Sequence, residues 1–215
     1  MNNSPRIINN IIFDLSEVLL TGIKDVGIAL GEKHKLEGVI DHTVGWTNIK
    51  TPLLIPLVKE LMHGNVSEDE YIKGVLDQYP QLGTADWLKQ HIRENFKEIE
   101  GTRDIILKLR DLKYTLALLS VHTKEWIDYC EQKFDFHKLF DVRSYSYETK
   151  VSKPHPLSFQ KVLEELKAAP ENCLFIDDSE INIKIAGELG IRSLLFTDAM
   201  NLSDDLSKLL PDFRI

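Results

Sequence analysis

Cysteine is scarce in this chain, with only Cys130 and Cys173 among 215 residues. Two cysteines do not make a disulfide scaffold, and Cys173 opens an apolar run, so a reducing cytoplasm is the expected compartment. Long apolar runs are missing too, since none approaches the roughly 20 residues of a membrane helix. The first ten residues lack the ordered basic, apolar and cleavage regions of a secretory signal. These absences argue against a secreted disulfide-rich protein and against a membrane-spanning one.

Positive charge is also in deficit, with 26 basic against 34 acidic side chains and a net charge of −8. Such a surface repels nucleic-acid phosphates and anionic lipid, so we expect neither nucleic acid nor membrane as a partner. A local basic pocket for a small anion is still compatible with this charge. Low-complexity tracts and solenoid repeats are absent. The length fits one substantial domain, or one core with a smaller inserted domain.

What the sequence does contain is a series of short apolar runs. They lie at 11–13, 115–119, 173–176 and 193–196, with a weaker candidate at 141–145. Short unbroken runs suit strands that are buried on both faces of a parallel sheet. Helical spacing occurs between the later runs, at 102–112, 156–167 and 179–189. This alternation predicts an α/β fold with a doubly wound, Rossmann-like parallel sheet.

The segment from residue 24 to about residue 97 has a different pattern. It holds helical stretches at 53–62 and 67–79, and no convincing strand. Ser67 and Glu70 have the spacing of a capping box. The segment is longer than one crossover connection usually needs, so we expect a helical insert rather than helices that merely cover the sheet. We predict a core at 1–21 and 98–215 and a helical domain at 22–97.

Polar residues follow three of the apolar runs at once. Asp14 follows the first run, Ser120 the second, and Asp177 with Asp178 the third. Ligands of open parallel sheets bind beyond the carboxyl ends of the strands, so these side chains are expected at one edge. Taken singly, each has a simpler explanation, because Asp and Ser commonly end strands and cap helices. Taken together, they indicate a site.

Carboxylates that share a small site repel one another unless a cation neutralises them. Oxygen ligands without a Cys/His cluster point to magnesium rather than zinc, and the seven histidines show no metal-type spacing. Lys153 precedes a proline-started helix and belongs to a loop, where it could hold a phosphate and the aspartates. A solvated surface lysine is the simpler alternative, and Lys150 is the nearby competitor.

Four segments, in this order, resemble the four motifs of the haloacid-dehalogenase-like (HAD) superfamily. They are IIFDLSEVLL, TLALLSVHT, KVSKPHP and CLFIDDSEINIKIAGELGI. The resemblance implies a HAD-like core with an inserted helical cap that closes over the substrate and sets specificity. Among close types, the sequence looks like small-sugar phosphatases and like the N-terminal domains of certain epoxide hydrolases.

This resemblance implies a magnesium-dependent phosphatase of a small phosphorylated metabolite. In that mechanism Asp14 attacks phosphorus and forms an aspartyl phosphate, which water then hydrolyses. Ser120 and Lys153 would hold the phosphate oxygens, with Val121 beside them in the substrate-binding segment. Val121 is a departure from the family pattern, since many relatives carry asparagine there and valine offers no polar contact.

The resemblance also implies the magnesium ligands, which would be Asp14, Asp178 and the backbone carbonyl of Ser16, with Asp177 in support. The family usually has a second aspartate at the position of Ser16, which protonates the leaving group and later activates water. A serine hydroxyl cannot act as an acid or base near neutral pH. Such catalysis is typically worth about 10²–10⁴ in rate, so slow turnover is expected. Glu17 is a hypothetical substitute for this missing acid–base group. The alternative is that Glu17 is a solvent-facing loop residue.

Two other functions stay open. One is a catalytically weak HAD-like binding or regulatory protein, which Ser16 and Val121 favour. The other is a 2-haloacid dehalogenase, whose relatives also lack the second aspartate but need no metal. The Asp177–Asp178 pair favours phosphate chemistry over that alternative.

Some features of the helical segment carry weaker predictions. Trp46, His63 and Trp87 are candidates for setting substrate specificity. The sequence supports that role no better than it supports a place in the hydrophobic core. The linkers at Thr21–Gly22 and Glu100–Gly101 are expected hinges, because glycine adapts to large backbone changes. The sequence predicts neither the substrate nor the oligomeric state.

Overall fold

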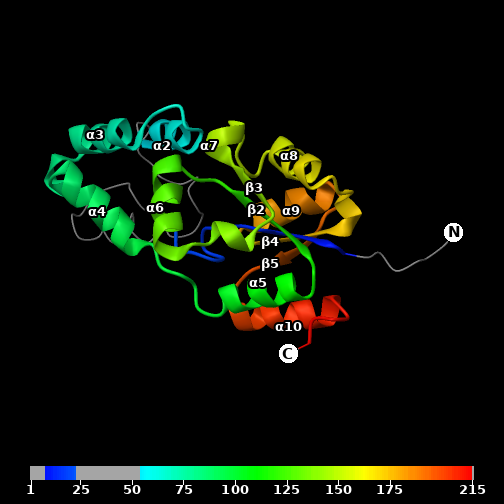
Figure 1. Ribbon diagram of the computed structural model, residues 1–215. Coiled ribbons are helices and arrows are strands. Elements are labelled where there is room, and N and C mark those ends of the chain that lie inside the picture. The colour runs from blue at the N-terminus through cyan, green and yellow to red at the C-terminus, as the bar shows by residue number, and fades with distance from the viewer. Residues whose placement is uncertain (1–7, 23–53, 215) are drawn as a thin grey trace.

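The computed structural model of the protein describes residues 8–22 and 54–214, and Figure 1 shows a sheet flanked by helices. All strand pairings in this sheet are parallel, and the strand order is β3-β2-β1-β4-β5. The strands are β1 (Asn10–Phe13), β2 (Thr115–Ser120), β3 (Val142–Tyr145), β4 (Cys173–Asp177) and β5 (Arg192–Leu195). The predicted α/β class with a doubly wound parallel sheet is confirmed.

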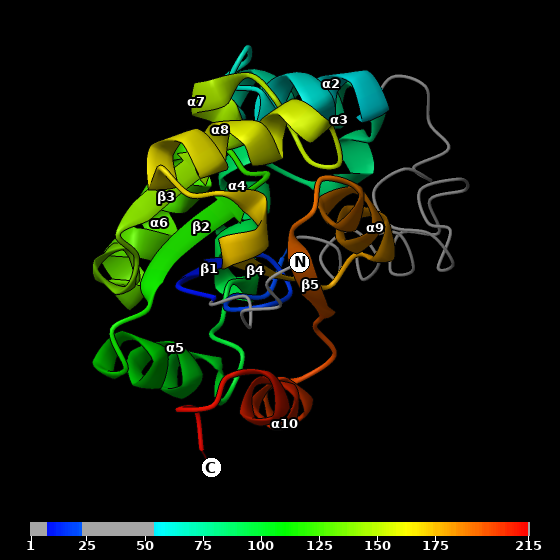
Figure 2. The same cartoon turned by 90° about the vertical axis from the view of Figure 1, so that its right-hand side faces the viewer.

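Helices cover both faces of the sheet, as the side view in Figure 2 shows. One face carries α5 (Thr102–Asp111) and α10 (Ala199–Leu209), and the other carries α8 (Pro156–Leu166) and α9 (Glu180–Glu188). The connections after β2 and β3 form α6 (Lys124–Phe134) and α7 (Ser146–Thr149). Short 3-10 helices lie at Pro80–Leu82, His137–Leu139 and Pro170–Asn172. Helices α5, α8 and α9 match the predicted ranges to within one residue at each end, whereas α6, α7 and α10 were not predicted.

The central strands bury both of their faces, which explains their unbroken apolar runs. In β1, Ile11 and Phe13 pack in a hydrophobic cluster with Trp126 of α6. The side chain between them, Ile12, packs in a second cluster with Phe159 of α8. Fully burying one such side chain contributes roughly 1.5–3 kcal/mol. The strand therefore anchors both layers of helices and fixes where Asp14 emerges.

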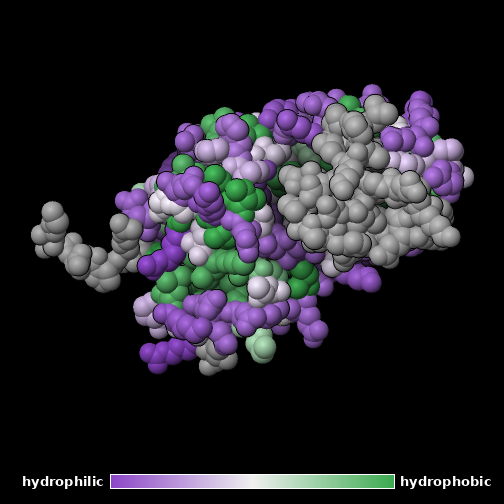
Figure 3. All heavy atoms as spheres, turned by 180° about the vertical axis from the view of Figure 1, so that it is seen from behind, coloured by the Kyte–Doolittle hydropathy of each residue, from purple (hydrophilic) through white to green (hydrophobic). Residues whose placement is uncertain are grey.

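The edge strand β5 is less buried, because it has a neighbour on one side only. It begins one residue before the predicted 193–196, and Leu195 at its end is 41% exposed. Seen from behind, hydrophobic side chains gather over this part of the sheet, with hydrophilic ones around them (Figure 3). The strand has only four residues, so it presents few unpaired backbone groups.

The part of the helical segment that the structure describes consists of α2 (Leu54–Met62), α3 (Glu68–Gln78) and α4 (Ala85–Asn95). Figure 1 shows these helices beside α6 and α7, where the strands end. The capping box of Ser67 and Glu70 is confirmed, with both reciprocal hydrogen bonds present. Residues 54–97 contain no strand, and no helix within 8–22 or 54–214 is long and apolar enough to cross a bilayer. The domain limits at 21/22 and 97/98 stay a prediction.

The entry to and exit from the helical segment run side by side. The Thr21 N–H donates to the Lys97 carbonyl at 2.9 Å, and the Ile99 N–H donates to the Leu19 carbonyl at 2.9 Å. The Asn95 side chain adds a hydrogen bond to the Gly22 carbonyl at 2.7 Å. Large bending at the predicted Thr21–Gly22 hinge would therefore have to break these three hydrogen bonds.

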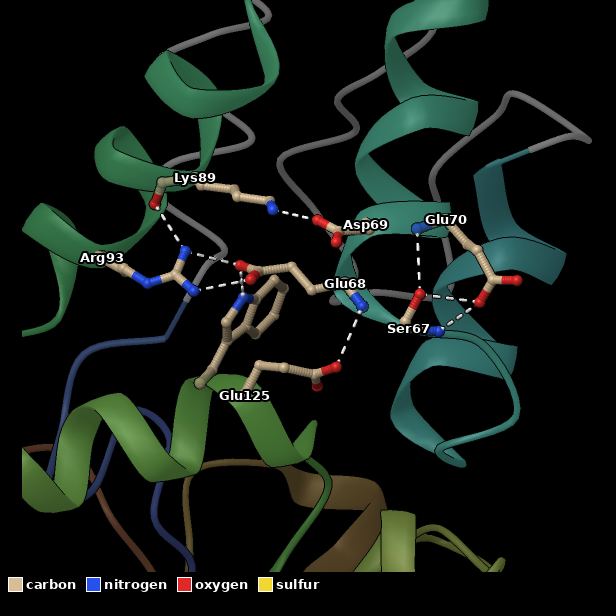
Figure 4. A network of polar contacts seen from close by, with 8 residues as sticks. Ser67, Glu68, Asp69, Glu70, Lys89, Arg93 and Glu125 are labelled. Carbon is tan, nitrogen blue, oxygen red and sulfur yellow. Dashed lines mark hydrogen bonds and ion pairs between the residues drawn. The ribbon is translucent and has the colours of Figure 1, made fainter.

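A buried ion pair ties the helical segment to α6, and Figure 4 shows its geometry. Glu68, at the start of α3, is only 4% exposed. Its carboxylate accepts two hydrogen bonds from the Arg93 guanidinium, at 2.8 and 2.6 Å, and one from the Trp126 indole N–H at 2.8 Å. The Glu68 backbone N–H also donates to the Glu125 carboxylate at 3.2 Å. Helices α3, α4 and α6 are thus joined through one side chain.

Replacing this carboxylate should cost far more than replacing its exposed neighbour. Glu68→Ala leaves the Arg93 guanidinium and the Trp126 N–H without their acceptor, and we expect a loss of about 3 kcal/mol in the free energy of unfolding. The matched control is Asp69→Ala, which removes an exposed ion pair with Lys89 and should cost less than about 1 kcal/mol. Urea unfolding of both variants measures the difference. Equal losses would contradict the role given to Glu68.

Candidate active site

The register of the central strands brings the predicted polar residues to one edge. Phe13 of β1 lies level with Leu118 of β2 and with Ile176 of β4. Asp14 is the next residue, and its N–H donates to the Ile176 carbonyl at 2.9 Å. Ser120 and Asp177 are the last residues of their strands. Three segments far apart in the chain therefore end side by side, as predicted.

A lysine lies within the resulting cluster of carboxylates. Asp14, Asp177 and Asp178 have carboxylate oxygens that all lie within 4.8 Å of one another. The Lys153 ammonium is 2.8 Å from Asp14 Oδ1 and 2.6 Å from Asp177 Oδ2, and its side chain is 3% exposed. The alternative of a solvated surface lysine is therefore wrong for Lys153. The competitor Lys150 instead donates to the carbonyls after α2.

The two neighbouring aspartates after β4 have different surroundings. Asp177 is fully buried, and its Oδ1 accepts hydrogen bonds from the Ser179 N–H and the Asn182 amide, both at 2.9 Å. These bonds hold the start of α9, so Asp177 does serve the helix start that follows it. Asp178 is exposed and contributes a carboxylate oxygen to the same cluster. The second aspartate of the pair thus lies at the exposed side of the cluster. Asn182 was not predicted to contact Asp177. The available signal was its position in the predicted helix, five residues after Asp177.

Burial controls the charge of this cluster. It raises the pKa of Asp14 well above its ordinary value of 3.8; Lys153 opposes this rise, whereas Asp177 and Asp178 add to it. Burial also lowers the pKa of Lys153, but the two contacting carboxylates outweigh it and the pKa is raised overall. Three carboxylates and one ammonium leave an excess of two negative charges when all are ionised. A divalent cation balances that excess.

Ser120 provides a hydroxyl without a partner. It is 2% exposed, and among the described residues its Oγ has no hydrogen-bond partner. A buried hydroxyl left unsatisfied costs about 1–3 kcal/mol, which a ligand oxygen would recover. The next residue, Val121, is half-buried against the core and offers only methyl groups. An all-oxygen donor set beside an unpaired hydroxyl fits magnesium together with an anion.

Comparison with known proteins identifies the family. The sequence model of the haloacid dehalogenase-like hydrolases matches residues 58–196. The chain belongs to this family. The resemblance predicted from the four motifs is confirmed.

Several relatives of this HAD-like hydrolase have named activities. The D-ribitol-5-phosphate phosphatase of Bacteroides thetaiotaomicron is 26% identical over 212 residues, which cover 95% of this chain and 99% of the relative. Flavin mononucleotide hydrolase 1 of Arabidopsis thaliana is 28% identical over 125 residues, so this chain spans about half (49%) of that protein. A HAD family enzyme of B. thetaiotaomicron has a TM-score of 0.76 at 25% identity, with 93% of this chain and 98% of that chain covered. Its complex with magnesium and inorganic phosphate matches with a TM-score of 0.70, over 89% and 95% of the two chains.

The turn after Asp14 shows how this HAD-like hydrolase departs from the pattern. Ser16 lies there, half-buried, so the usual second carboxylate is absent from that position. Glu17 adopts a left-handed conformation with φ of 59°, and its carboxylate accepts the Gly22 N–H at 2.8 Å. Glu17 is thus not a solvent-facing loop residue but fastens the turn. Its backbone conformation is uncommon for a non-glycine residue and was not readable from the sequence.

The specificity candidates of the helical segment gain no support from the geometry. Trp46 lies outside the described residues. Trp87 of α4 stacks on His91 of the same helix, with ring centroids 4.8 Å apart. His63 follows the end of α2, and its backbone carbonyl accepts the Lys150 ammonium. A residue near the site that was not predicted is His122, whose pKa burial lowers to about 4, so it is neutral at pH 7.

The raised pKa of Asp14 predicts a pH-dependent cost of ionising the site. The unfolded chain releases this proton near pH 3.8 and the folded chain only at higher pH, so stability falls as the pH rises through that interval. In a chelator, Asp14→Asn should therefore be more stable than the wild type at pH 7, and the gap should shrink as the pH falls toward 3.8. Thermal unfolding across this range measures it. A wild type more stable than the variant at pH 7 would refute the prediction.

Proposed function

We propose that this chain is a magnesium-dependent phosphatase of a small phosphorylated metabolite, with Asp14 as the nucleophile. The observation that carries the proposal is the Lys153-bridged carboxylate cluster beside the Ser120 hydroxyl, which has no partner in the part of the chain that the structure describes. The relative that acts on D-ribitol 5-phosphate and the similar enzyme that binds magnesium and inorganic phosphate support the same chemistry.

The reaction begins with phosphate binding. The Ser120 hydroxyl donates to one phosphate oxygen, and the Lys153 ammonium lies close enough to Asp14 to attract another. The Leu15 N–H and the Lys153 ammonium both contact the Asp14 carboxylate at Oδ1. We assign attack on phosphorus to Oδ2, which forms the Asp14–phosphorus bond and breaks the bond to the leaving alkoxide. Water then attacks the aspartyl phosphate, releasing inorganic phosphate and restoring the carboxylate.

Charge neutralisation makes this attack feasible. Asp14, Asp178 and the Ser16 carbonyl would hold magnesium, with Asp177 in support, and the bound ion would neutralise the phosphate oxygens as charge develops. Lys153 lowers the pKa of Asp14 against the effect of burial and so favours the ionised form that a nucleophilic carboxylate requires. Asp177 in turn holds Lys153 in place at 2.6 Å. Positioning and electrostatics thus supply most of what phosphoryl transfer demands.

Proton transfer is the weak step of this site. The leaving alkoxide needs a proton, and Ser16 stands where the family usually provides a carboxylic acid. Esters with a good leaving group need that proton least. We therefore propose slow turnover of alkyl phosphates and faster turnover of aryl phosphates.

We further propose that residues 22–97 form the cap of this enzyme and that it acts in the cytoplasm. The position of α2, α3 and α4 beside the ends of the strands supports the cap assignment (Figure 1). The cytoplasmic assignment rests on Cys130 and Cys173, whose buried thiols are unpaired.

The direct test is release of phosphate from a panel of sugar phosphates and an aryl phosphate. We expect activity that is lost in a chelator, restored by magnesium, and reduced more than about 10³-fold in Asp14→Asn. Halide release from 2-haloacids without metal would instead indicate a dehalogenase. Phosphate binding without turnover would indicate a binding or regulatory protein, and either result would overturn the proposal.

Restoring the missing acid should repair the weak step. Ser16→Asp is expected to raise kcat on alkyl phosphates by about 10²-fold, with a smaller gain on an aryl phosphate. The matched comparison is Glu17→Gln, whose amide oxygen still accepts the Gly22 N–H but cannot transfer a proton. We expect its kcat to be unchanged within about twofold. A large loss in Glu17→Gln would make Glu17 the substitute acid and base, and no gain in Ser16→Asp would remove proton transfer as the limit.

A further inference from the structure

We propose that Ser146 is a positioning residue that sets the Ser120 segment against the end of α2, an inference that rests on the proposed function. Ser146 is the first residue of α7, directly after β3, and is 1% exposed. Its hydroxyl accepts the His122 N–H at 3.0 Å and donates to the Met62 carbonyl at 2.6 Å, with the His122 carbonyl as a more distant acceptor at 3.3 Å. One buried hydroxyl therefore joins three segments that are distant in sequence.

The first of these segments carries the proposed phosphate contact. Ser120 ends β2, and His122 is two residues further on. The His122 ring is buried and lies near Phe96 and Trp126, with ring centroids 5.9 and 5.8 Å away. Because the His122 ring is packed and the His122 backbone N–H is bonded to Ser146, the short stretch from Ser120 to His122 has little conformational freedom. The direction of the Ser120 hydroxyl is thereby set in part by Ser146.

The second segment is the end of α2, in the proposed cap. Met62 is the last residue of that helix, so its carbonyl lacks an intrahelical partner and accepts the Ser146 hydroxyl instead. The next two carbonyls, of His63 and Gly64, accept the Lys150 ammonium at 2.6 and 3.0 Å. Ser146 and Lys150 thus supply hydrogen-bond donors to the carbonyls at the carboxyl end of α2. The positive charge of Lys150 also interacts favourably with the negative end of the helix dipole.

These contacts link the placement of α2 to phosphate binding. A shift of α2 away from α7 would remove the Met62 acceptor of the Ser146 hydroxyl, and the His122 carbonyl, 3.3 Å away, would take its place. The hydroxyl would then turn toward His122, which changes its hydrogen bond with the His122 N–H and the position of the Ser120 segment. The helical segment therefore acts on the phosphate through this hydroxyl, at a distance from any contact with the substrate.

The test is a double-mutant cycle on phosphate affinity, measured as competitive inhibition by inorganic phosphate and by calorimetry with magnesium present. We expect Ser146→Ala to weaken phosphate binding about tenfold, because it removes the hydrogen bonds of the hydroxyl with Met62 and His122. Ser120→Ala should weaken it by a similar factor. In the Ser120→Ala background, Ser146→Ala should have no further effect, since it acts through Ser120.

Ser158→Ala is the matched control, because Ser158 is buried as Ser146 is (2% exposed) but its hydroxyl donates within its own turn, to the His155 carbonyl at 2.8 Å. Phosphate affinity in this variant should be unchanged even if its urea midpoint falls as far as that of Ser146→Ala. Additive effects in the cycle, or equal losses in the control, would overturn the role of Ser146 and leave the phosphatase standing. A wild type that binds no phosphate would overturn the proposed function, and this inference with it.

Discussion

The contact on which the site depends is the bridge from the Lys153 ammonium to Asp14 and Asp177. Buried carboxylates at close range repel one another, and burial alone would favour their neutral forms. A single ammonium between two of them opposes this effect by favouring their ionised forms, at a cost in desolvation that such buried pairs only partly recover. The edge of the sheet therefore holds an excess of negative charge, which a divalent cation relieves.

The sheet supplies the precision that this contact needs. Asp14 emerges between β2 and β4, and the side chains of β1 are locked into separate clusters on the two faces. A slip of one residue in β1 would exchange those faces, so core packing and site geometry are specified by the same register. Precise placement of the site residues thus comes from the strands.

Much of this architecture was predictable from the sequence, for identifiable reasons. The runs that became β1, β2 and β4 are buried on both faces, so their apolar character is continuous. The edge strand β3 gave a weaker signal, because Arg143 at its centre is exposed. The residues alone left Lys150 as a competitor, and only the family resemblance selected Lys153, since the two share one loop and differ in what the fold brings near. Glu68 could not be recognised as buried, because an acidic first turn is also the ordinary signature of an exposed helix start.

The central position of β1 has a consequence for how the protein is made. Its partners lie about 100 and about 160 residues further along the chain, because Asn10 pairs with Thr115 and with Cys173. During synthesis this apolar strand leaves the ribosome long before either neighbour exists, and pairings of such sequence separation form slowly. Assembly of the catalytic edge and closure of the hydrophobic interior are therefore a single late event, so a truncated nascent chain has neither.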